Sequence, residues 1–263
     1  MRRVPLTLLL LAVALVFSSA VVAEDAPLIS LTILQDNYVH DAAFRREWGF
    51  ACLVKGLEKT ILFDTGGFKY ALQANMETAG ISATSIDTIV LSHIHQDHIR
   101  GFECLLPLPR EMKLFLPASF TTYERGRFEV PGAAITWVDA PAEICRNAIT
   151  TGEMGGAVIE QALALRTAGG LVVVTGCAHP GIVEIVEAAQ ALFPREQIAL
   201  VLGGFHLLRS GEATIRGIAE RLREMGVRRI APTHCSEDLS REVFREVFGA
   251  DYIEAGVGLV LEL

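Results

Sequence analysis

The sequence predicts an α/β protein in which two β-sheets pack face to face, with helices on their outer sides, in a single domain. Two observations lead to this prediction. The first half of the chain is rich in short apolar runs typical of strands, and the second half alternates strands with helices, with no linker between the halves. A length of 263 residues with 51% hydrophobic side chains is enough for one large core.

In the first half, the strands are expected in short apolar runs bounded by turns. The second and third strands form a hairpin, and a helix over 68–78 ends before Gly80. The segment 117–140 has no clear pattern and is expected to be irregular. The expected strands are 28–34, 49–54, 60–63, 86–91 and 113–116.

In the second half, β-like runs alternate with amphipathic helical patterns. Strands are expected at 170–175, 198–202 and 229–233, helices at 182–192, 213–225 and 237–247, and a closing strand at 257–261.

Four potential metal ligands follow directly on the apolar run 86–91, in the order His93-x-His95-x-Asp97-His98. Imidazole nitrogens and carboxylate oxygens suit zinc, iron or manganese. A helix would place the first three on different faces, so we expect a loop at a strand end that aims all four at one point. The alternative, an ordinary polar loop, explains this spacing poorly.

Three further histidines, His179, His206 and His234, each follow an expected strand. Ligands of open α/β proteins gather at the carboxyl ends of strands, so we expect these side chains to join the motif. His40 lacks this context and is interpreted as a loop histidine. Asp64 ends the strand 60–63, and we expect its carboxylate to orient a metal-binding histidine rather than to cap a turn.

Residues 1–23 have the pattern of a secretory signal peptide, with cleavage expected after Ala23. Arg2 and Arg3 precede a long apolar run that ends in small residues. An uncleaved membrane anchor is the alternative. The mature chain 24–263 is expected in the periplasm or secreted, with only transient membrane contact through the signal peptide.

Loss of this segment changes the net charge from −8 to −10, because it removes two arginines and no acidic residue. Nucleic-acid binding requires clustered Lys and Arg, so we expect a small-molecule substrate and no nucleic acid. The oligomeric state stays open.

All five cysteines lie in the expected mature chain, so at least one thiol is unpaired in a monomer. Cys177 and Cys235 stand beside His179 and His234, and three interpretations of them stay open: buried cysteines, a disulfide or redox-sensitive pair, or thiolate metal ligands. The cysteines are Cys52, Cys104, Cys145, Cys177 and Cys235.

The motif 93–98, with Asp64-Thr65-Gly66 upstream and single histidines downstream, resembles the metallo-β-lactamase superfamily. The resemblance covers essentially the whole mature chain and implies an αββα sandwich with a metal centre at one edge of the sheets. Five further segments are similar to the branch of dihydropterin-ribofuranosylaminobenzene-phosphate synthase: 150–153, 160–163, 175–182, 203–207 and 232–235.

The resemblance implies two divalent metal ions, with zinc expected and manganese or iron as alternatives. One ion would lie on His93, His95 and His179, and the other on Asp97, His98 and His234. Most members have an aspartate that bridges both ions, and His206 stands in its place here. The two nitrogens of an imidazole diverge, so we expect His206 to bind one ion or the substrate. Trp48 stands where the branch usually has histidine.

The implied activity is hydrolysis of a small ester, lactone or phosphoester by a metal-activated water, with Asp97 and His206 as catalytic residues. Asp97 would steer the proton of the attacking water. Three alternatives stay open: a synthase or transferase, as the branch name implies; a mononuclear iron oxygenase; and a non-catalytic periplasmic metal- or ligand-binding module.

Overall fold

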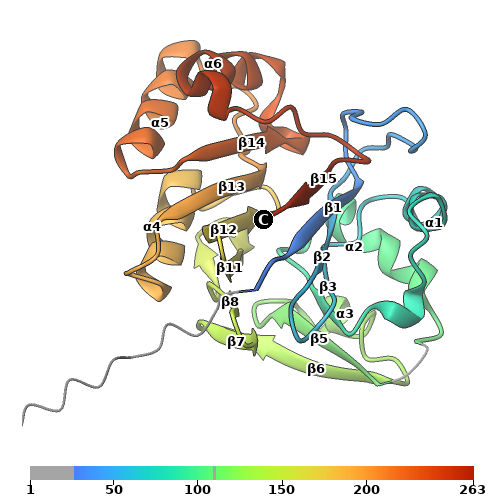
Figure 1. The fold of residues 1–263 in the computed structure, drawn as a ribbon. Coiled ribbons are helices and arrows are strands. Elements are labelled where there is room, and N and C mark those ends of the chain that lie inside the picture. Colours follow the sequence, from blue (N-terminus) through green and yellow to red (C-terminus); the bar gives the residue numbers. More distant parts are fainter. Residues whose placement is uncertain (1–26, 109–110) are drawn as a thin grey trace, which may run out of the picture.

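The computed structural model describes residues 27–108 and 111–263, which form two mixed β-sheets packed face to face (Figure 1). In sheet order, the first sheet consists of β15 (Val260–Glu262), β1 (Ser30–Gln35), β2 (Ala51–Lys55), β3 (Ile61–Phe63), β4 (Thr88–Val90), β5 (Met112–Pro117) and β6 (Ala133–Val138). The second consists of β14 (Arg229–Thr233), β13 (Ile198–Gly204), β12 (Gly170–Thr175), β11 (Leu163–Thr167), β8 (Ala148–Thr150) and β7 (Ala142–Cys145). A small ribbon joins β9 (Met154–Gly155) to β10 (Ile159–Glu160).

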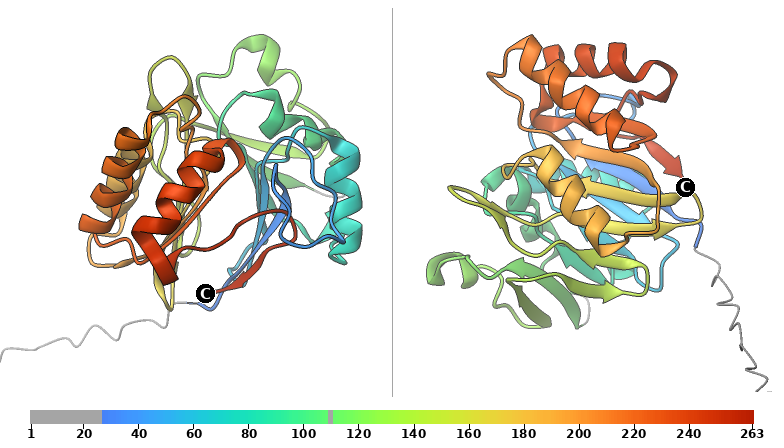
Figure 2. Two further views of the ribbon diagram at one scale, coloured as in Figure 1. Left: turned by 90° about the horizontal axis from the view of Figure 1, so that it is seen from above. Right: turned by 90° about the vertical axis from the view of Figure 1, so that its left-hand side faces the viewer.

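Helices cover the outer face of each sheet, so the predicted αββα sandwich is confirmed. Figure 2 shows α4, α5 and α6 outside the second sheet and α1 outside the first. The helices are α1 (Lys69–Thr78), α2 (Gln96–Ile99), α3 (Thr122–Arg125), α4 (Ile182–Leu192), α5 (Glu212–Glu224) and α6 (Asp238–Phe248). Four 3₁₀ turns lie at Ala83–Ser85, Arg100–Leu105, His234–Ser236 and Gly249–Asp251 in the described chain.

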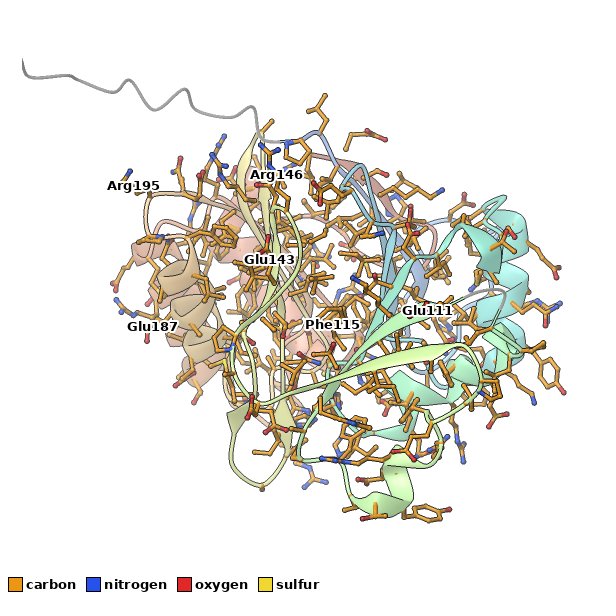
Figure 3. All side chains as sticks on the ribbon, turned by 90° about the horizontal axis from the view of Figure 1, so that it is seen from below. Glu111, Phe115, Glu143, Arg146, Glu187 and Arg195 are labelled. Atoms are coloured by element: carbon orange, nitrogen blue, oxygen red, sulfur yellow. The ribbon has the colours of Figure 1, made fainter. Side chains whose placement is uncertain are left out.

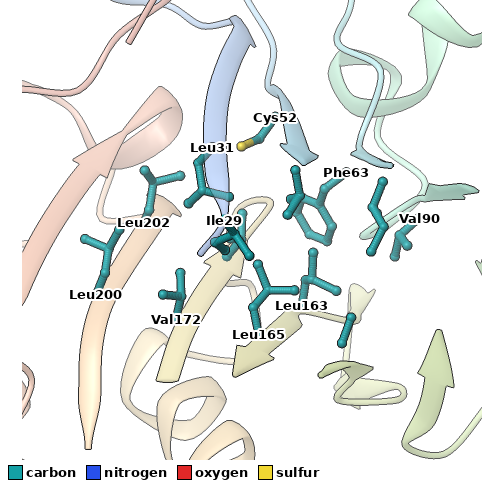
Figure 4. Close-up of a cluster of buried hydrophobic side chains, with 14 of the residues drawn as sticks. Ile29, Leu31, Cys52, Phe63, Val90, Leu163, Leu165, Val172, Leu200 and Leu202 are labelled. Carbon is teal, nitrogen blue, oxygen red and sulfur yellow. The ribbon is translucent and has the colours of Figure 1, made fainter. Parts of the chain in front are cut away.

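The apolar runs of the central strands are continuous because both faces of these strands are buried. In β12, Val172 and Val174 point into the core between the sheets, whereas Leu171 and Val173 point toward the outer helices. In Figure 4, Leu31 and Phe63 of the first sheet approach Leu165 and Leu202 of the second. Side chains from both sheets therefore form one shared core.

The helices bury one face each, as their sequence period requires. Ile182, Ile185, Val186 and Ala189 of α4 are buried, and they lie one turn apart. Because β12, β13 and β14 pair in parallel and their connections contain α4 and α5, their carboxyl ends meet at the same edge. The β–α alternation of the sequence therefore brings three strand exits together.

The middle of the chain differs from its prediction. The segment expected to be irregular contains α3 and β6, and β6 is a fully paired edge strand beside β5. Figure 3 shows Phe115 of β5 between the sheets, where it belongs to the shared core. Strand β6 escaped prediction because four of its six residues are only half-buried, which weakens the apolar alternation.

The predicted signal peptide, residues 1–23, lies outside the described residues. Over residues 27–108 and 111–263, none of the helices combines the length and apolar composition that a membrane crossing requires.

A buried carboxylate links the two sheets just beyond β1 and β14. Asp36 is fully buried, and it accepts hydrogen bonds from Thr233 Oγ1 at 2.7 Å and from the Tyr38 backbone N–H at 2.9 Å. Burial raises the pKa of Asp36 to about 6, although both hydrogen bonds oppose the shift. Asp36 therefore takes up a proton at a higher pH in the folded chain than in the unfolded chain.

Replacement of this carboxylate by an amide should flatten the pH dependence of stability. Because the pKa of Asp36 is higher in the folded than in the unfolded chain, wild-type stability falls as the pH rises from about 4 to about 6. This group accounts for a loss on the order of 3 kcal/mol. Asp36→Asn should lack that loss in denaturant unfolding with a chelator present. Parallel pH profiles of the two proteins would contradict the assignment, and Asp41→Asn, at an exposed position, is the control.

Candidate metal centre

Four strand exits converge at one edge of the sandwich and bring together all seven predicted ligands. Strand β4 leads to the motif 93–98, β12 to His179, β13 to His206 and β14 to His234. His40 lies apart, and its Nδ1 atom is 3.0 Å from the Glu254 carbonyl oxygen. The convergence follows from the parallel pairing of the strands.

The first group of candidate ligands is formed by His93, His95 and His179, whose ligand atoms lie within 4.8 Å of one another. His179 Nε2 is 3.3 Å from His93 Nε2 and 3.2 Å from His95 Nδ1. Two nitrogens that bind one tetrahedral zinc ion, each at about 2.0–2.1 Å, lie about 3.3 Å apart. The spacing of this group therefore fits a metal ion.

The second group is formed by Asp97, His98 and His234. Asp97 Oδ2 lies 3.4 Å from His234 Nε2 and 3.8 Å from His98 Nε2. His234 Nε2 is buried and has no hydrogen-bond partner among the described residues. A buried nitrogen without a partner is costly unless a ligand satisfies it, so this group also fits a metal ion.

Hydrogen bonds fix the orientation of the three buried histidines at their far nitrogens. His98 Nδ1 lies 2.7 Å from Asp64 Oδ2, and His234 Nδ1 lies 3.1 Å from Asn37 Oδ1. His93 Nδ1 lies 2.9 Å from Ser92 Oγ, whose own proton is donated to Asp64. In each case the acceptor holds the Nδ1 proton, so Nε2 faces the candidate ligands.

Asp64 therefore lies where an orienting carboxylate was expected. It is fully buried, and besides His98 it accepts the backbone N–H of Ser92 at 2.7 Å. The charge and hydrogen bond of Asp64 oppose the effect of burial on His98 and raise its pKa to about 9.

A second buried carboxylate, Glu160, holds the loop after β12. It accepts the backbone N–H groups of Cys177, Ala178 and His179 at 2.8–2.9 Å. Burial raises the pKa of Glu160, and these three bonds oppose the shift. Glu160, Asn37 and Ser92 were not predicted as site residues. Glu160 and Asn37 contact loops distant in sequence, and Ser92 is tied to the site by its bonds to Asp64, 28 residues away.

The exposed histidine ring of His206 lies at the rim, 4.1 Å from the ring of His179. His206 forms a candidate group with His179 and Cys177. Cys177 also groups with members of both candidate ligand groups and lies between them. His206 borders only the first group, which agrees with the expectation that it does not bridge the two.

Electrostatics favour neutral imidazoles in the first group. Burial and the neighbouring histidines lower the pKa of His93 well below its usual value, and burial with His206 lowers the pKa of His179 to about 3. Burial opposes ionisation of Asp97, but His234 and His98 outweigh it and lower the pKa of this carboxyl. Neutral imidazoles beside an ionised carboxylate are the states in which these groups bind a metal ion.

The cluster opens to solvent on one side. His95 is exposed, and a cavity of about 560 Å³ borders His179 and His206, with Ile182 and Ile218 among its apolar lining. Near the second group, Trp48 Nε1 donates a hydrogen bond to Asp97 Oδ2 at 2.8 Å. The site is therefore rigid at its base and accessible at its rim.

Comparisons with known proteins agree with this geometry. The family model of the anti-Pycsar protein Apyc1 matches residues 39–117. The chain is 26% identical to the 7,8-dihydropterin-6-methyl-4-(β-D-ribofuranosyl)-aminobenzene-5′-phosphate synthase of Methanocaldococcus jannaschii, over 88% of this chain and 95% of the relative.

Solved structures share the fold over most of the chain. Tm1679, a metal-dependent hydrolase of the β-lactamase superfamily, superimposes with a TM-score of 0.74 at 27% identity, over 89% of this chain and 99% of that one. The metallo-β-lactamase fold protein YhfI from Bacillus subtilis superimposes with a TM-score of 0.66 at 17% identity, over 90% and 100% of the two chains. The chain therefore has the metallo-β-lactamase fold, and its predicted resemblance to that superfamily and to the synthase-like branch is confirmed.

Proposed function

We propose that this chain is a hydrolase that uses a metal-activated water on a small-molecule ester, lactone or phosphoester. The observation that carries the proposal is the pair of three-ligand groups whose buried histidines are oriented by Asp64, Ser92 and Asn37. Polar groups held in this way at an accessible cavity are typical of an active site.

In this proposal, His93, His95 and His179 hold one divalent ion, expected to be zinc, and Asp97, His98 and His234 hold the other. Bound ions of this kind lower the pKa of a coordinated water and polarise the oxygen of a carbonyl or phosphoryl group. Asp97 is half-buried and ionised, so a carboxylate oxygen would accept a hydrogen bond from the attacking water and orient it. His206, at the rim of the cavity, contacts the substrate.

The size and lining of the cavity support a small-molecule substrate. Its volume of about 560 Å³ lies within the usual range for small-ligand sites. Apolar side chains make up part of the wall, and His179 of the first group borders the cavity together with His206.

A synthase is the second candidate, because the M. jannaschii relative carries that name and aligns with nearly the whole chain. The two candidates differ in product balance. A synthase joins two substrates with no net consumption of water, whereas a hydrolase yields two products from one substrate.

Removal of an exposed ligand should abolish hydrolysis without unfolding the chain. We expect His95→Ala to lower turnover of chromogenic esters and phosphodiesters by more than about 100-fold. Loss of a residue that only orients a metal ligand already costs up to about 100-fold, and His95 is a ligand itself in this proposal. Elemental analysis should show about two ions per wild-type chain and about one in the variant. His40→Ala should match the wild type, and full turnover by His95→Ala would refute the proposal.

Removal of the charge that orients His98 should weaken metal binding. Asparagine at position 64 offers one acceptor oxygen to three donors, so Asp64→Asn should lower metal affinity about 10–100-fold. Chelator competition measures the change, at a pH above the His98 pKa of about 9 so that protons compete weakly for this ring in both proteins. Asp41→Asn provides the surface control. Unchanged affinity in Asp64→Asn would show that the carboxylate is structural only.

A further inference from the structure

We propose that the thiolate of Cys177 is a metal ligand shared by the two ligand groups. The inference deepens the proposed function and rests on it, because it concerns the same metal centre. It selects one of the three interpretations of the cysteines that the sequence left open.

The position of Cys177 is the first observation. The residue is buried, and its Sγ atom lies 3.2 Å from His98 Nε2. Its sulfur belongs to three sets of possible metal ligands, and these sets include members of both ligand groups. The partners of Cys177 in the three sets are His93 with His98, His179 with His206, and His234 with Cys235. A ligand that serves two ions must reach both clusters, and the Cys177 sulfur does so.

The contact with His98 is itself compatible with a metal site. If the contact is a hydrogen bond, either Cys177 Sγ or His98 Nε2 donates a proton to a lone pair of the other atom. A cation can replace that proton, and a thiol that coordinates a metal is deprotonated. The nearby Nε2 atom of His234, which lacks a partner in the described chain, is an independent sign of a ligand at the same place.

The backbone around Cys177 holds the sulfur in this position. Glu160 accepts the Cys177 N–H, and Gly176 passes so close to Ser92 that a Cβ there would lie 2.2 Å from the hydroxyl oxygen. Ala178 has a left-handed backbone, with φ of 62°. These constraints aim the side chain at the cluster rather than into the apolar core.

Cys235 has a different role in this assignment. Its Sγ lies 3.2 Å from Cys177 Sγ, well beyond the S–S bond length of about 2.05 Å, so no disulfide joins the two residues. Cys235 belongs to a candidate group only together with Cys177 and His234. In this assignment Cys235 stays protonated and directs its S–H at the Cys177 sulfur.

A sulfur ligand narrows the choice of metal. Thiolates favour zinc and iron, whereas manganese prefers carboxylate and other oxygen ligands. We therefore expect zinc or iron, and not manganese, as the resident metal.

Cobalt substitution tests the assignment by a signal that is independent of turnover. The full chain, kept reduced with a phosphine, is stripped with a chelator and reconstituted with Co²⁺. Wild type should show the visible bands of bound cobalt and a near-ultraviolet sulfur-to-cobalt charge-transfer band. Cys177→Ser should lose the sulfur band but keep the visible bands, because the histidines remain. Cys235→Ser and Cys104→Ser should keep both.

Three outcomes would overturn the proposal: visible bands without a sulfur band in wild type, a sulfur band that survives in Cys177→Ser, or a Cys177–Cys235 disulfide that persists under the reductant. Visible bands with no sulfur band leave the proposed function intact. A wild-type chain that binds no cobalt, zinc or iron contradicts the metal centre itself, and with it the proposed function. X-ray absorption of the zinc-loaded wild type, with a sulfur expected at about 2.3 Å, decides the case if Cys177→Ser does not fold.

Discussion

The carboxylate of Asp64 holds together the exits of two neighbouring strands and two of the buried histidines. It lies at the end of β3 and accepts three hydrogen bonds, two from Ser92 after β4 and one from His98. Ser92 in turn holds the ring of His93. Since all these groups are buried, loss of the carboxylate would leave several donors without partners.

The same arrangement recurs around the cluster. Glu160 holds the backbone before His179, and Asn37 binds both the ring and the carbonyl oxygen of His234. The backbone at these exits is left-handed at non-glycine residues: Asp64, Ala178, His206 and His234. Such conformations cost of order 1–3 kcal/mol each and persist where surrounding contacts enforce them. At Ala178 the enforcing contact is the Glu160 carboxylate, and at His234 it is the Asn37 amide.

The sequence is sufficient to predict the sandwich and the gathering of histidines, because both depend on local patterns. Apolar runs locate β12, β13 and β14, and each predicted exit ends at a histidine. The two candidate groups have the composition that the family resemblance implied. The strands β7, β8 and β11 did not stand out, since strands of four, three and five residues offer too few positions for a clear apolar pattern.

The contacts that orient the ligands were harder to predict, because they join residues that are far apart in the sequence. Asn37 and His234 are 197 residues apart, and Glu160 reaches a loop after the neighbouring strand. Asp64 was predictable because it directly ends a strand beside glycines. The place of Cys177 between the two groups depends on how β12 passes Ser92, which no sequence period encodes.

The candidate site has two parts: a base of buried side chains and a rim of exposed ones. His93, His98, His234 and Cys177 are nearly inaccessible, and packing fixes their orientation. His95 and His206 are exposed, and the adjoining cavity is shaped by α4 and α5. The base can supply the same electrostatic environment to different substrates, while the rim selects which bond is brought to it.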